Sequence, residues 1–103
     1  MQYIQSAQLK SAGTWDLSET KFATALEASK LVDDLKYQAR RLNYNKDIRK
    51  LLDNCDVLVG KLGNAEVRAR QLHKPYLANK PREELAQAID YVEKILLILR
   101  LTQ

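Results

Sequence analysis

The stretch of sequence that decides the fold is ALEASKLVDDLKYQARRL, residues 25–42. Its apolar residues recur every three or four positions, and the main set is Ala25, Ala28, Val32, Leu35, Ala39 and Leu42. This spacing places them along one side of an α-helix. Three of the six are alanine, so another helix can approach this side closely. The stretch therefore predicts an amphipathic helix that packs against a neighbouring helix.

Three further stretches show the same period. Their apolar seams consist of Ile48, Leu52, Cys55, Val59 and Leu62, then Ala65, Ala69, Leu72 and Tyr76, and finally Leu85, Ile89, Val92, Leu96 and Leu99. We therefore expect helices over about 18–43, 46–62, 64–78 and 81–101. The chain has only three Gly and two Pro, which does not favour a β-rich fold with many turns.

Capping residues set the expected helix boundaries. Ser18 can accept a hydrogen bond from a first-turn N–H group and so begin the first helix. The segment 43–45, Asn-Tyr-Asn, separates the first two helices, because asparagine tolerates the left-handed backbone that ends a helix. Gly63 is expected to end the second helix for the same reason. Pro75 lacks the N–H group of a helix interior, so the third helix should be kinked or end near Lys74.

All the expected connections are short, which makes neighbouring helices antiparallel. The sequence therefore predicts an all-α protein: an up-down-up-down four-helix bundle over 18–103. Residues 1–17 show no sustained apolar period and are expected to form an N-terminal arm. In this topology the first and third connections lie at the same end of the bundle.

The composition limits the chemistry. The chain has 103 residues with one Cys and one His, so an internal disulfide and a cysteine-cluster metal site are excluded. We expect no metal and no cofactor. The longest apolar run is Ile95 to Leu99, far short of the roughly 20 residues that a membrane-spanning helix needs. We find no secretory signal and expect a cytoplasmic protein that does not enter a membrane.

Basic residues outnumber acidic ones by 17 to 13, which gives a net charge of +4. The expected topology gathers many of them at one end, which we call the predicted basic pole. Its candidate nucleic-acid-binding residues are Lys36, Arg40, Arg41, Tyr44, Lys46, Arg49, Lys50, Lys74, Tyr76, Lys80 and Arg82. Lysine and arginine contact phosphates, and tyrosine rings can stack on unpaired bases. The alternative is that these cations only keep a solvated end of the bundle soluble.

The last helix ends in an apolar segment, which we call the helix 4 tail: Ile95, Leu96, Leu97, Ile98, Leu99 and Leu101. These side chains point in almost every direction around the helix axis, so the tail must be covered on nearly all sides. One small bundle cannot do this alone. We expect a homo-oligomer formed through the tail, with coverage by the N-terminal arm as the alternative.

The segment from Arg68 to His73 resembles the Arg-x4-His spacing of HEPN ribonucleases, which are also small helical bundles. The resemblance implies that Arg68 stabilises a phosphate and that His73 transfers a proton during phosphodiester cleavage. It covers six residues, and Ala69 stands where the family commonly has a polar Asn. On an ideal helix the two side chains would point about 140° apart. We assign no catalytic residue from the sequence.

Three functions follow from these patterns. The first is a non-enzymatic helical-bundle module that binds nucleic acid or another polyanion at the predicted basic pole. The second is a protein–protein interaction bundle, such as an adaptor or an immunity-type protein, that works through the helix 4 tail. The third is a small HEPN-like ribonuclease. The sequence favours the first of these and favours a protein that is not an enzyme.

Overall fold

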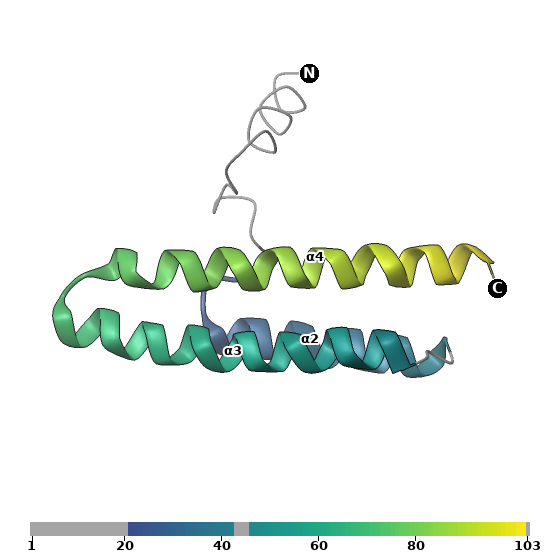
Figure 1. Cartoon of the computed structure of the whole chain (residues 1–103), viewed down its shortest axis with the longest axis horizontal. Coiled ribbons are helices and arrows are strands. Elements are labelled where there is room, and N and C mark those ends of the chain that lie inside the picture. Colours follow the sequence, from purple (N-terminus) through teal and green to yellow (C-terminus); the bar gives the residue numbers. More distant parts are fainter. Residues whose placement is uncertain (1–20, 43–45, 103) are drawn as a thin grey trace, which may run out of the picture.

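The computed structural model describes residues 21–42 and 46–102. This part of the chain forms three α-helices and one 3-10 helix: α2 (Ala25–Arg41), α3 (Lys46–Leu72), η2 (Pro75–Ala78) and α4 (Asn79–Thr102). Figure 1 shows α3 and α4 side by side as a long antiparallel hairpin, with α2 packed beside α3. The all-α prediction is confirmed. Within these residues no helix is both long and apolar enough to cross a membrane.

The predicted four-helix bundle is wrong for the described residues, because the second and third expected helices are one helix. α3 is 27 residues long and runs without interruption through Gly60 and Gly63. Neither glycine has the positive φ of a helix stop, and the start of α2 packs against α3 at Gly63. The expected arm over 1–17 and the expected cap Ser18 lie outside the described residues.

The first described helix begins later than expected, at a capping box that the sequence reasoning missed. The hydroxyl of Thr24 accepts a hydrogen bond from the backbone N–H of Glu27 at 3.2 Å. In return, the carboxylate of Glu27 accepts from the backbone N–H of Thr24 at 3.1 Å and from that of Ala23 at 2.8 Å. These bonds satisfy N–H groups that have no partner within the helix.

The end of α3 confirms the expected break near Lys74. His73 adopts φ 55°, in the left-handed region. The N–H of His73 donates to the carbonyl of Arg70 at 3.3 Å, and the N–H of Lys74 donates to that of Ala69 at 2.9 Å. This pair of bonds is a Schellman motif, in which the left-handed position usually holds glycine. Pro75 then begins η2, which leads directly into α4.

The core confirms most of the predicted seams. The fully buried large side chains are Val32 and Leu35 of α2, Cys55 and Leu62 of α3, and Leu85, Val92 and Leu96 of α4. Burying one such aliphatic side chain contributes about 1.5–3 kcal/mol. Leu72 and Tyr76, which were expected on the third seam, are about half exposed or more. They lie past the start of α2, where no third described α-helix covers the hairpin.

The difference in helix length shapes the molecule. α2 has 17 residues against 27 in α3, or about 25 Å against about 40 Å. The first residue of α2, Ala25, lies opposite Gly63 of α3. A Cβ added to Gly63 would lie 3.7 Å from the Cβ of Ala25. The α3–α4 hairpin therefore extends past the start of α2. We call this overhanging part, residues 69–82, the hairpin tip.

Candidate nucleic-acid interface

The structure separates the residues that were expected to share one basic pole. Because α3 is continuous, its first residue, which follows α2 in the chain, and its last residue, which precedes η2 and α4, are about 40 Å apart. Lys74, Tyr76, Lys80 and Arg82 belong to the hairpin tip. The other described candidates lie at the far end or near it, and Tyr44 lies outside the described residues. The prediction of a single pole is therefore wrong.

One end of the bundle nevertheless gathers basic residues. We call it the basic end, and its exposed members are Arg40, Arg41, Lys46, Arg49, Lys50 and Arg100. Arg100 was not among the predicted residues. In a three-helix arrangement α4 ends near the end of α2 and the start of α3, as Figure 1 shows on the right. The helix 4 tail lies at this same end of the bundle.

Side chains from different helices meet in two hollows of the basic end. Arg40 of α2 and Arg49 of α3 line a hollow of about 180 Å³, together with the carboxylate of Asp53. Arg41 of α2 and Arg100 of α4 line another of about 330 Å³. Cations from all three helices thus border concave surface, where a phosphate group could contact more than one of them.

Two of the neighbouring side chains have structural partners. The ammonium of Lys36 lies 2.6 Å from the carboxylate of Asp56 on α3. The hydrogen bond to Asp56 raises the pKa of Lys36 above its ordinary value. Lys36 therefore joins α2 to α3, so we no longer count it as a phosphate ligand. The guanidinium of Arg41 lies over the ring of Tyr37, 5.8 Å from its centre.

The exposed side of α3 extends the basic end along the bundle. Its residues repeat at intervals of four and three, and this α3 row consists of Lys50, Asn54, Val57, Lys61, Asn64 and Arg68, all exposed. On an ideal helix the three cations of the row lie within about 20° of one another. The row contains no acidic residue. It could not be seen from the sequence while Lys50 and Arg68 were assigned to two different helices.

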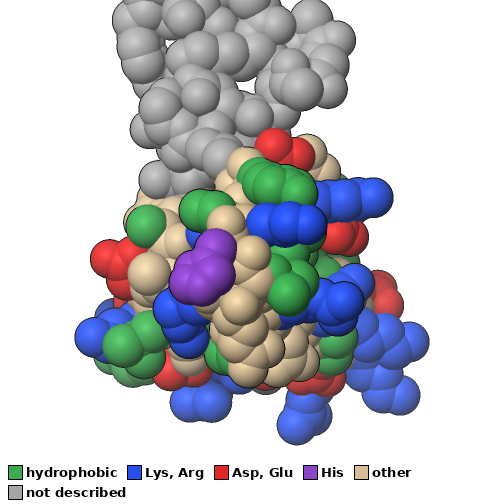
Figure 2. Space-filling view, turned by 90° about the vertical axis from the view of Figure 1, so that its left-hand side faces the viewer, with side chains coloured by type: hydrophobic (Ala, Val, Ile, Leu, Met, Phe, Trp, Pro, Cys, Tyr) green, Lys and Arg blue, Asp and Glu red, His purple; other side chains and the backbone are tan. Residues whose placement is uncertain are grey.

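The hairpin tip holds a cavity of about 540 Å³, which we call the tip cavity. Figure 2 looks onto this end of the molecule, where basic and acidic side chains alternate and the histidine lies at the surface. The lining residues are Ala23, Thr24, Glu66, Ala69, Arg70, His73, Pro75, Ala78 and Arg82. The cavity lies where the hairpin extends past the start of α2, so that no third described α-helix fills this space.

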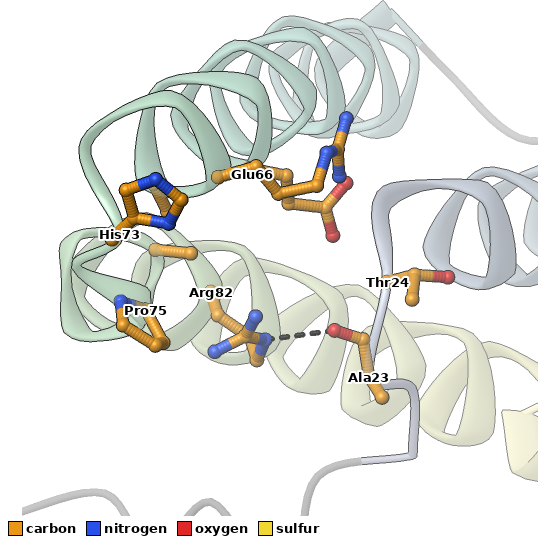
Figure 3. Close-up of a pocket in the computed structure, with 9 residues that line it drawn as sticks. Ala23, Thr24, Glu66, His73, Pro75 and Arg82 are labelled. Carbon is orange, nitrogen blue, oxygen red and sulfur yellow. Dashed lines mark hydrogen bonds between the residues drawn. The ribbon is translucent and has the colours of Figure 1, made fainter.

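Hydrogen bonds hold two charged groups at the tip cavity (Figure 3). The Nε of Arg82 donates to the carbonyl of Ala23 at 2.8 Å, and its Nη1 donates to the amide oxygen of Asn79 at 3.1 Å. The carboxylate of Glu66 accepts from the backbone N–H of Ala25 at 2.9 Å. These bonds link the start of α2 to both helices of the hairpin.

The structure does not bring the HEPN-like pair together at this cavity. His73 lines it, whereas Arg68 does not and belongs to the exposed α3 row. The arginine that accompanies His73 in the lining is Arg70. Among the residues that the structure describes, no group of three or more His, Cys, Asp or Glu side chains could hold a metal ion.

Comparison with known proteins adds no assignment. No known protein family, no curated protein and no solved structure matches this chain.

Proposed function

We propose that the protein is a non-enzymatic module that binds nucleic acid at the basic end. The observation that carries this proposal is that arginines of different helices meet in pairs at this end: Arg40 and Arg49 line one hollow, and Arg41 and Arg100 line the other. Local acidic groups offset only part of this charge, since Asp47 and Asp53 are the acids beside it in α3. A surface of this kind binds phosphates with a strong dependence on salt.

The α3 row supports a duplex as the preferred form. Lys50 and Arg68 are separated by about 27 Å along the helix, so a rigid polymer could contact cations over that length. Lysine, asparagine and arginine all donate hydrogen bonds, which suits phosphates and base edges. Tyr76, the aromatic residue expected to stack on single strands, lies at the hairpin tip and is not part of this surface.

A fluorescence titration at two salt concentrations tests the proposal, with labelled duplex DNA and single-stranded RNA as probes. The double variant Arg40→Glu/Lys46→Glu should weaken binding strongly and lower the slope of log affinity against log salt by about 1.5. The matched control is Lys74→Glu/Lys80→Glu, which makes the same charge change at the hairpin tip. Equal effects of the two variants, or no binding by the wild type at low salt, would contradict the proposal.

The contribution of the α3 row is measured separately with Lys61→Glu/Arg68→Glu. This variant should weaken duplex binding more than single-strand binding, because only the rigid duplex spans the row. If Lys61→Glu/Arg68→Glu leaves duplex affinity unchanged and Arg40→Glu/Lys46→Glu lowers it, binding is confined to the basic end.

A second candidate function, protein–protein association, rests on the helix 4 tail. Leu97, Ile98 and Leu101 are 50%, 59% and 77% exposed, which is an unusual concentration of apolar surface at one helix end. The neighbouring charges Asp90 and Lys94 pair with each other at 3.0 Å, so this face offers a second copy mainly apolar contact. We propose a two-fold homodimer through this face.

Sedimentation velocity over a range of concentrations tests the dimer. Ile98→Glu should shift the wild-type dimer to monomer, whereas Val57→Glu, which adds the same charge at an exposed position of α3, should not. A wild-type species of 11.8 kDa at every concentration would contradict this proposal.

A further inference from the structure

The tip cavity is a second concave site, at the opposite end of α3 from the basic end. We propose that it binds a small organic carboxylate. The carboxylate of the ligand would lie between the guanidinium groups of Arg70 and Arg82, and its apolar body would contact Ala23 and Pro75. This inference does not depend on nucleic-acid binding, since it uses none of the residues assigned to that function.

The arginines are suited to hold the anionic group. The described bonds of Arg82, to Ala23 (Figure 3) and to Asn79, use two of its five guanidinium N–H groups and fix the direction of the side chain. Arg70 reaches the same cavity from the last turn of α3. Guanidinium groups bind carboxylates through two parallel hydrogen bonds, with geometric selectivity that lysine lacks.

The charge of the lining favours a singly charged ligand. The two arginines bring two positive charges and the carboxylate of Glu66 removes one, so these three side chains together carry one positive charge. The carboxylate of Glu66 lines the cavity and also accepts a hydrogen bond from the N–H of Ala25. A carboxylate balances this charge, whereas a phosphate dianion exceeds it.

The walls and size of the cavity favour a ligand with an apolar body. Ala23 and Pro75 are exposed and give the cavity apolar wall surface, while Ala69 and Ala78 are buried behind it. The volume of about 540 Å³ lies within the roughly 300–1,000 Å³ typical of small-molecule sites. The cavity is therefore larger than a bare inorganic anion needs.

The test follows backbone and arginine side-chain N–H signals of the full chain by NMR during titration with sodium benzoate. Benzamide, which has the same shape without the charge, and inorganic phosphate are titrated in parallel. Benzoate should shift signals of residues 69–82 and bind in the millimolar range, as expected for a ligand of this size. Benzamide should bind about tenfold more weakly, because it loses the charge-assisted bonds.

Two variants connect the signal to the arginines. Arg70→Gln should weaken benzoate binding about tenfold, while the control Arg68→Gln, two residues away and outside the cavity, should leave it unchanged. Arg82→Lys keeps the charge but loses the paired bonds, and should also weaken binding. The proposal is overturned if benzoate shifts no tip signals, if benzamide or phosphate binds as tightly, or if the Arg70 and Arg68 variants behave alike.

Discussion

The carboxylate of Glu66, in the second half of α3, accepts a 2.9 Å hydrogen bond from the backbone N–H of Ala25, the first residue of α2. It places a negative charge at the positive end of the α2 dipole and satisfies an N–H group that has no partner within its own helix. Glu66→Ala should lower the free energy of unfolding by about 1–2 kcal/mol. Glu66→Gln keeps an acceptor and should cost less. Urea unfolding checks both, with the exposed Glu84→Ala as the control.

The two glycines inside α3 offer a direct test of its continuity. A Cβ added at Gly60 meets no atom within 4 Å, and one added at Gly63 makes an ordinary contact with Ala25. Gly60→Ala and Gly63→Ala should each raise the free energy of unfolding by about 0.5–1 kcal/mol, because alanine favours the helix. If a helix ended at Gly63 instead, Gly63→Ala would lower the free energy of unfolding, because alanine is strained in the left-handed conformation of a helix cap.

His73 occupies a backbone conformation that favours glycine. His73→Gly should therefore raise the melting temperature, with a gain in stability of about 1 kcal/mol. His73→Ala retains the unfavourable φ and should give no such gain. If both substitutions have the same effect, the side chain of His73 matters more than its backbone.

The capping box gives stability a dependence on pH. Hydrogen bonds from the backbone N–H groups of Ala23 and Thr24 lower the pKa of Glu27 below its unfolded value of 4.5. A lowered pKa means that the contribution of Glu27 is complete above pH 4.5 and is lost as the pH falls through the lower folded value. Urea midpoints measured at pH 7 and pH 3 should therefore differ more for the wild type than for Glu27→Gln. A steeper dependence in the variant would reject this role.

Cys55 is fully buried in α3, and burial raises the pKa of its thiol to about 11. At pH 8 only about one thiol in a thousand is then ionised, so labelling with a thiol reagent should be slow in the native state and fast in urea. Cys55→Ala should lower the free energy of unfolding by about 1–3 kcal/mol. Fast native labelling would show that this face of α3 is open to solvent.

The apolar period predicted the helices and most of the core. Val32, Leu52 and Ile89 are buried as their spacing predicts. An apolar seam along a helix is stable only when it is packed away from water. The predicted helix end at Gly63 is wrong, because α3 continues through it. Its local preference favours a helix end, but packing of the start of α2 beside it favours a continuous helix. That packing is long-range and leaves no local signal.

The same error explains why the candidate site was only half predicted. Joining two helices removes one reversal of the chain, so α4 runs in the opposite direction from the one expected. Arg100 moves to the basic end, while Lys80 and Arg82 move away from it. The charges of each local segment were identified correctly from the sequence. Their grouping depended on the number of helices between them, which a single wrong boundary changes.

The short α2 also has a consequence for how the molecule opens. Among the described residues, the hairpin tip consists of the ends of α3 and α4 with η2 between them, whereas residues 48–62 lie within a three-helix core. Local unfolding of the tip exposes less apolar surface than global unfolding, so it should need less free energy. Amide hydrogen exchange should accordingly show a gradient along the single helix α3, with protection falling from Leu52 toward Leu72. A ligand in the tip cavity would then slow exchange at the end of that gradient, far from the end where nucleic acid would act.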